Sequence, residues 1–550
     1  MKYPNQTSVF ARYKRESSRK KPATYLPILP TTALNHLIDA TNYQKWQRNF
    51  QHTARPEKDF QNSENMERHH DWQTLNDLAQ TSSSASSHSE QVKHLLARAG
   101  FGATFAELKE LESNSIAEIV EELLTEPALP TPPGEWVTEP FDLQQYLKWT
   151  ESEKQAYFVQ NIERINDLRV WMLELMMSSA INLREKMTFF WHGHFTTDIS
   201  SAELAQFLFK QNDTYRKHAL GNFGDFLKNV YKDPGMLLYL NGAQNVVTAP
   251  NENFARELME LFTMGIGNYT EDDIKEAARA FTGWEIDPYN LTSFFNPNLH
   301  DYGVKSFLGE RGNFDGDDII DLILKQPQTA TFICRKFYEF FISREVDEEY
   351  VQDLAAVFRA NNYEIKPVLR SLFTSEHFYN ANVRASLIKS PIELVVGNAR
   401  KLSVEKADVY FLLTVAAILD QELLNPPNVA GWPGQRAWIS PTTYVLRNTV
   451  SEIFVNENLV RDPVTNQPVI EFNPMKFARS FGIPTAPELA NAIINYLVSR
   501  PLDEVTSEFL LQTLVGTAAP NDWSLDYPGA DRLVTEFVIQ ILRLPEYHLT

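Results

Sequence analysis

Cysteine is almost absent from this sequence. Cys334 is the single cysteine among 550 residues, which excludes an intrachain disulfide framework and any zinc or iron–sulfur centre built from several thiolates. It lies in the segment TFICRKFYEFF, where apolar residues recur at helical spacing. The pattern predicts a buried structural thiol rather than a nucleophile.

Long apolar runs are also missing. No stretch approaches the roughly 20 residues that a membrane-spanning helix needs, and the basic N-terminal segment is not followed by the apolar core of a secretory signal. We therefore expect no transmembrane segment and a cytoplasmic location by default, with export by another route left open. Hydrophobic residues still make up 43% of the chain, which predicts a soluble globular protein.

Positive charge is scarce. The chain has 51 lysines and arginines against 71 aspartates and glutamates, a formal net charge of -20. Such an acidic body repels a phosphate backbone, so we expect no nucleic-acid partner. The sequence also has no glycine-rich phosphate loop, no G-x-S-x-G elbow and no H-E-x-x-H helix, which disfavours common nucleotide enzymes, serine hydrolases and zincins.

The dominant positive signal is helical periodicity. It is clearest over residues 155–180, where apolar residues recur three and four positions apart. Strand signals are few, and the best of them predict a small β-hairpin insertion near residues 284–308. We expect a mainly α fold, a multi-helix array, with residues 1–88 as a partly irregular N-terminal extension and 89–550 as a helical domain of one or two lobes.

The segment FFWHGHFTTD places His192 and His194 one glycine apart. In an unbroken helix their side chains point roughly 160° apart. They converge only if the helix ends near Trp191 and Gly193 adopts a positive φ. In that case both are candidate ligands of a divalent metal, which needs at least a third ligand. The alternative is that both are core residues with satisfied nitrogens.

The segment NENFARELMELFTMG carries a second set of candidates. Asn253, Glu257 and Glu260 lie along one flank of its apolar stripe. A carboxylate at that edge is either paired or functional, because burial otherwise raises its pKa. Glu257, the nearest to the core, is the candidate third metal ligand and a candidate catalytic group, and Asn253 and Arg256 are candidate ligand-binding residues. The alternative for Arg256 is a local ladder of ion pairs.

Two irregular segments complete the candidates. PNLHDYG contains His300 and Asp301, which suit metal ligation or acid–base catalysis, or alternatively an Asx-turn with an exposed histidine. The loop NPPNVAGWPGQRAWI contains Trp432 and Trp438. These two rings are either a stacking platform for a ligand or packing against neighbouring helices.

Several segments resemble those of one bacterial family. In chain order they are HLLARAGFG, LREKMTFFWHGHFTT, DPGMLLYLNG, NENFARELMELFTMGIGNYTEDDIKEAARAFTGW, HDYGVKSFLG, IKSPIELVVG and PPNVAGWPGQRAWIS. The chain resembles the domain of unknown function 1800 family from about Gln91 to near its C-terminus. The resemblance implies a bacterial origin, a largely helical domain and a sulfatase-like partner encoded nearby, but no established reaction.

Two functional hypotheses follow. The first is a metal-dependent hydrolase in which His192, His194 and Glu257 hold a divalent cation that activates water, with His300 or Asp301 as a further ligand or base. The second is a noncatalytic helical scaffold or binding module that acts with a sulfatase-like partner. In that case the same polar groups form a buried hydrogen-bond network, and the tryptophan loop is a contact surface.

Overall fold

The computed structural model describes residues 87–457, 459–462 and 464–550. The predicted N-terminal extension over residues 1–88 lies outside the described residues, except for its last two positions. The described chain is mainly helical, with three two-stranded antiparallel sheets, which confirms the predicted fold class. None of the helices in this part of the chain is long and apolar enough to cross a membrane.

The first half of the described chain is a succession of helices. Its helices are α5 (His88–Ala99), α6 (Phe105–Leu111), α7 (Ile116–Leu123), α8 (Leu143–Tyr146), α9 (Glu151–Met177), α10 (Leu183–His194), α11 (Ile199–Ala202), α12 (Ala205–His218), α13 (Phe223–Val230), α14 (Pro234–Tyr239), α15 (Asn253–Glu257), the π-helix η3 (Leu258–Thr263) and α16 (Glu271–Ala280).

The second half continues the helical array. Its helices are α17 (Gly316–Leu324), α18 (Pro327–Phe341), α19 (Glu348–Ala360), α20 (Ile365–Thr374), α21 (Pro391–Lys401), α22 (Val409–Ile418), α23 (Pro441–Ile453), α24 (Pro474–Arg479), α25 (Ala486–Leu497), α26 (Glu504–Val515), α27 (Ala530–Leu542) and the short 3-10 helix η7 (Pro545–His548).

Local sequence explains where several helices begin. The long helix α9, predicted from its periodicity, starts after Thr150, whose side chain accepts from the Glu153 backbone N–H (3.3 Å) while the Glu153 carboxylate accepts from the Thr150 N–H (2.7 Å). The same reciprocal capping box opens α16 with Thr270 and Asp273. Each box satisfies two backbone donors that a helix start leaves without a partner.

The predicted β insertion contains two hairpins. β1 (Trp284–Asp287) pairs with β2 (Thr292–Phe295), and β3 (Lys305–Phe307) pairs with β4 (Glu310–Gly312). The sequence predicted one hairpin here, and the structure has two. Each strand pairs with its neighbour in the chain, because closing a short loop costs less chain entropy than closing a long one. The remaining sheet joins β5 (Lys406–Ala407) to β6 (Ile470–Glu471).

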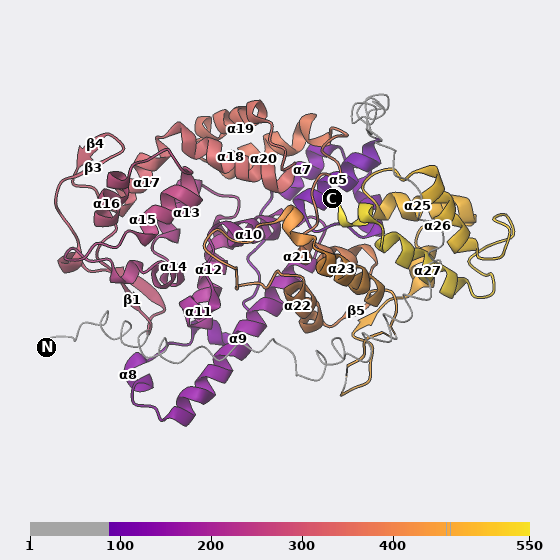
Figure 1. The fold of residues 1–550 in the computed structure, drawn as a ribbon, viewed down its shortest axis with the longest axis horizontal. Helices are drawn as coiled ribbons and strands as arrows, with labels where there is room; N and C mark the ends of the chain where they lie inside the picture. The colour runs from indigo at the N-terminus through magenta and orange to yellow at the C-terminus, as the bar shows by residue number, and fades with distance from the viewer. Residues whose placement is uncertain (1–86, 458, 463) are drawn as a thin grey trace, which may run out of the picture.

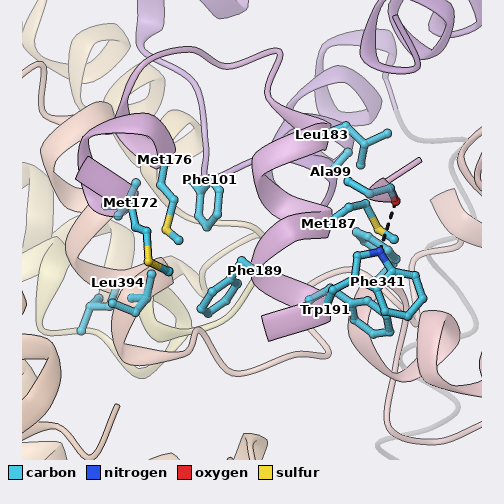
Figure 2. Close-up of a cluster of buried hydrophobic side chains, with 14 of the residues drawn as sticks. Ala99, Phe101, Met172, Met176, Leu183, Met187, Phe189, Trp191, Phe341 and Leu394 are labelled. Carbon is cyan, nitrogen blue, oxygen red and sulfur yellow. Dashed lines mark hydrogen bonds between the residues drawn. The ribbon is translucent and has the colours of Figure 1, made fainter. Parts of the chain in front are cut away.

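Helix α10 is the central helix of the core. Figure 1 shows it near the middle of the fold, with α25–α27 at one end and β1, β3 and β4 at the other. All of its residues except Gly193 are buried, and it packs on α9 and α12. Figure 2 shows its Met187, Phe189 and Trp191 among buried side chains from other elements. A helix buried on every face is surrounded by protein rather than lying at its surface.

Candidate ligand-binding site

Helix α10 continues without a break to His194. The backbone N–H of Phe195 then closes the last turn on the Trp191 carbonyl (2.8 Å), and Gly193 is not among the glycines with positive φ. The condition for convergence of the two histidines, a helix end at Trp191, is therefore not met. His192 and His194 leave the helix on different sides.

Each imidazole has its own hydrogen-bond partner. His192 Nε2 accepts from the Leu424 backbone N–H (3.1 Å), so the proton of the neutral ring is on Nδ1. His194 Nε2 lies 3.0 Å from the Phe262 carbonyl oxygen. Because a carbonyl can only accept, this nitrogen carries the proton, and Nδ1 of His194 has a free lone pair. Nδ1 has no hydrogen-bond partner within the described chain.

Burial keeps both rings neutral. Desolvation lowers the pKa of His192 to about 4, and the nearby Arg169 acts in the same direction. Desolvation lowers the pKa of His194 to about 3, although its bond to the Phe262 carbonyl opposes the shift. Such rings accept hydrogen bonds at neutral pH, but they are too weakly basic to be efficient general bases there.

The NENFARELMELF segment is not a regular α-helix. Its α-helical part, α15, ends at Glu257, and the π-helix η3 follows over Leu258–Thr263. π-Helical turns are rare and occur frequently at functional sites. The Phe262 carbonyl of η3 accepts the bond from His194, and Glu260 of the same element lines the cavity described below.

The other candidates of this segment lie outside that cavity. Arg256 pairs with Glu252 (3.1 Å), as the ion-pair alternative predicted, but its second partner is Glu271 of α16 (2.8 and 2.9 Å) rather than Glu260. Asn253 is exposed at the start of α15. The carboxylate of Glu257 has no hydrogen bond or ion pair to any described residue, and partial burial raises its pKa.

A cavity of about 320 Å³ lies where α10, η3 and α18 meet residues 425–439, the tryptophan loop. Its size falls within the range of small-molecule pockets. Its aromatic lining residues are Phe189, Phe190, Phe332, Phe340, Trp432 and Trp438. Its titratable lining residues are Arg98, His194, Glu260, Lys336, Glu339, Arg344 and Glu393.

The tryptophan loop is seated tightly on the end of α10. A Cβ atom on Gly431 would lie 2.3 Å from the Gly193 carbonyl oxygen, and the φ of Gly431 is +78°. Both features require glycine at this position. The Thr196 hydroxyl also donates to the Val429 carbonyl (2.7 Å), and the Trp432 ring lies 5.5 Å from the His192 ring. These contacts hold the loop over the cavity.

Gly193 leaves space in the cavity wall. It lies within α10, and a Cβ atom built on it would meet no heavy atom within 4 Å. The metal hypothesis required this glycine to adopt a positive φ and end the helix. Instead, its missing side chain opens the helix surface to the cavity, so that a ligand can approach the backbone there.

The cavity has charged residues that sequence reasoning missed. Lys336 and Arg344 both pair with Glu339, at 3.4 and 3.3 Å. The sequence pattern that could have identified Lys336 is its spacing from Phe332 and Phe340. The three residues are four positions apart and therefore lie on one face of α18. Of the tryptophans, Trp438 is buried and Trp432 is half-buried. Both rings line the cavity, and their role as a stacking platform for a ligand stays a prediction.

His300 and Asp301 lie elsewhere and stabilise the hairpin region. His300 is buried, and its Nδ1 donates to the Thr282 carbonyl (2.9 Å). Asp301 forms a two-pronged ion pair with Arg279 (2.7 and 3.2 Å), and this guanidinium lowers the pKa of the carboxyl. The predicted Asx-turn is present, because Asp301 Oδ1 accepts from the Gly303 backbone N–H (2.7 Å). The predicted exposure of His300 was wrong, because Phe295 and Thr282 cover the ring.

The donor set predicted for a divalent metal is not assembled. His192 and His194 face different partners, Glu257 is outside the cavity, and His300 and Asp301 belong to the hairpin region. Among the described residues, no group of three or more histidine, cysteine, aspartate or glutamate side chains has a spacing that fits a metal ion. These residues therefore do not fit the predicted metal centre.

The molecule is thus a helical protein with a cavity between its central helix and a tryptophan loop. A model of the family described as "protein of unknown function (DUF1800)" matches residues 94–549, and the chain belongs to this family. The match includes every residue that lines the cavity apart from Thr550. Neither the curated proteins nor the solved structures contain a significant match to this chain.

Proposed function

We propose that this protein is a binding module for a small molecule with an apolar, planar part, held in the cavity between α10 and the tryptophan loop. The observation that carries the proposal is the vacant Cβ position of Gly193, which opens the central helix to a cavity lined by aromatic rings. Aromatic and apolar surfaces with a few convergent polar groups are typical of small-ligand sites.

The polar groups of the cavity would orient the ligand. His194 supplies an acceptor, Nδ1, whose orientation is fixed by the bond from Nε2 to Phe262. Glu260 accepts one hydrogen bond, from the Tyr269 hydroxyl (3.2 Å), and its other oxygen can accept from a ligand donor. The ligand then has at least one N–H or O–H group beside an apolar body.

This proposal corresponds to the binding-module hypothesis rather than to the metal-dependent hydrolase. The hydrolase needs His192, His194 and Glu257 around one cation, and the geometry of α10 separates them. Its candidate bases, His300 and Asp301, lie in the hairpin region, where His300 donates to the Thr282 carbonyl and Asp301 pairs with Arg279. Association with a sulfatase-like partner stays a proposal from the family resemblance, and co-purification with that partner would test it.

Binding of N-phenyl-1-naphthylamine tests the proposal. This neutral aromatic dye fluoresces more strongly in apolar surroundings, and we expect saturable binding of one dye per native chain. Gly193→Leu should abolish the binding, because the new side chain occupies the vacant position in the cavity wall. Trp432→Ala should weaken it by removing a ring from the lining.

Trp149→Ala is the matched control. Trp149 is also half-buried and packs on Tyr146 (5.2 Å) and Tyr157 (5.4 Å), outside the cavity. Dye affinity should be unchanged in this variant. Circular dichroism and thermal unfolding establish that each variant is folded. An unsaturable signal, or equal affinity in the wild type and a folded Gly193→Leu, would refute the proposal.

A further inference from the structure

Four cations gather around one carboxylate beside the cavity. Lys186 of α10 donates to Glu393 of α21 (Nζ to Oε1, 2.5 Å). Arg98, Lys389 and Arg447 also lie close enough for the charge of Glu393 to act on their pKa values. All four cations are buried. Desolvation lowers the pKa of Lys389 well below its usual range, so the net positive charge of the group comes chiefly from Lys186, Arg98 and Arg447.

Three of these cations have no carboxylate side chain as a direct partner in the described part of the chain. The Arg98 guanidinium donates to backbone oxygens, among them that of Thr550 (2.5 Å). The Lys389 ammonium donates to the Tyr547 carbonyl and lies 3.8 Å from the centre of the Tyr547 ring. Arg447 donates through Nη2 to the Lys389 carbonyl (2.9 Å). The partners of Lys389 and Arg447 are neutral dipoles rather than ions.

Some of their donors have no acceptor at all. Nε of Arg98, and Nε and Nη1 of Arg447, are buried without a hydrogen-bond partner. Buried charges are costly unless they are paired and hydrogen-bonded. Desolvation accordingly lowers the pKa of Arg98 to about 9 and that of Arg447 to about 10, with Glu393 opposing both shifts.

This group of cations reaches the cavity. Arg98, Ser390 and Glu393 form one side of its wall, and the Lys186–Glu393 pair stands directly behind it. The chain as a whole has a net charge of -20, so the positive field here is opposite in sign to that of the molecule. A ligand group entering on this side meets Arg98 and Glu393 on the wall. Lys186 and Arg447 are buried and do not line the cavity.

We propose that the side of the cavity lined by Arg98, Ser390 and Glu393 binds an anionic group of the ligand, a carboxylate, sulfate or phosphate. The anion offsets the buried positive charge of Arg98, the cation on the wall itself, and of Arg447, which does not line the cavity. The inference rests on the proposed function and makes it more specific, because the ligand becomes an amphipathic anion whose apolar part lies against the aromatic lining.

Two dyes with the same ring system separate this inference from the proposed function. 8-Anilinonaphthalene-1-sulfonate is N-phenyl-1-naphthylamine with an added sulfonate. We expect the sulfonate dye to bind the native protein several-fold more tightly at low salt. Sodium sulfate should compete with it more strongly than sodium chloride at equal ionic strength, because sulfate offers the same kind of anion.

Two substitutions test the origin of this preference. Glu393→Gln removes the carboxylate and should increase the affinity for the sulfonate dye. Arg447→Met removes one cation behind the wall and should decrease that affinity by about three-fold or more. Arg447→Met should leave the affinity for the neutral dye unchanged, because Arg447 does not line the cavity. Arg532→Met, which removes an exposed arginine from α27, is the charge-matched control and should change neither.

The outcomes are distinguishable. If neither dye binds the native protein at one site, the proposed function fails. If the neutral dye binds and the sulfonate dye binds no more tightly, the anion inference alone is overturned. The anion inference is also overturned if Arg447→Met, shown to be folded by circular dichroism, keeps the full preference for the sulfonate dye. Arg447→Met provides this test even where Glu393→Gln does not fold.

Discussion

Gly193 defines the site more than any side chain around it. A glycine inside a helix costs about 1 kcal/mol relative to alanine, and this one lies in the most deeply buried helix of the described chain. No atom occupies the position of its absent Cβ. The helix therefore carries a local cost in stability at the point where the cavity touches its backbone.

Gly193→Ala should raise the free energy of unfolding by about 1 kcal/mol, because alanine fits the helical conformation and meets no neighbour. Urea denaturation measures this change. Gly224→Ala in α13 is the control, since its Cβ would lie 2.7 Å from Leu324 Cδ1. The free energy of unfolding of Gly224→Ala should be unchanged or lower than that of the wild type. A destabilised Gly193→Ala would mean that the space beside Gly193 is not vacant.

At the scale of elements, local sequence determines where the helices form, but it does not determine the geometry of the site. Periodicity predicted α9, capping boxes open both α9 and α16, and the predicted buried thiol of Cys334 is confirmed within α18. The π-helix η3 had no signal, because six residues show no spacing that separates a π-turn from an α-turn. The path of the tryptophan loop depends on a contact between two glycines distant in sequence.

Two glycines of the tryptophan loop allow that contact to be measured. Gly431 and Gly434 have similar φ values, +78° and +73°, but only a Cβ on Gly431 would collide with the Gly193 carbonyl. Gly434→Ala should cost about 1 kcal/mol from backbone strain alone. Gly431→Ala should cost clearly more and should make the loop more susceptible to limited proteolysis. Equal losses in urea denaturation would contradict the close seating of the loop.

The whole molecule buries titratable groups whose charges are costly in its interior. Burial lowers the pKa of His192 to about 4, and those of His194 and His548 to about 3. Each lowered pKa contributes stability that is present above about pH 6.5 and is lost as the pH falls toward the folded-state value. Asp233 acts in the opposite sense, because burial raises its pKa to about 6.

His194→Gln should make the free energy of unfolding depend less on pH between pH 6.5 and pH 4. Relative to this variant, the wild type should lose on the order of 3 kcal/mol between pH 6.5 and pH 4, because protonation of a buried histidine favours the unfolded chain. Urea denaturation across this range measures the difference. His88→Gln, at an exposed histidine, is the control and should keep the wild-type slope. Parallel curves for the wild type and His194→Gln would contradict the burial of a neutral imidazole.

The sequence by itself determined the mainly α fold, the starts of several helices and the place of the β insertion, because neighbouring residues set helical periodicity, capping and turns. It also identified His194 and both loop tryptophans as notable. Only the tertiary structure decided that His192 and His194 diverge, and that α10, η3, α18 and the tryptophan loop enclose one cavity. Such convergence depends on how distant helices pack, and no local pattern in the chain encodes that geometry.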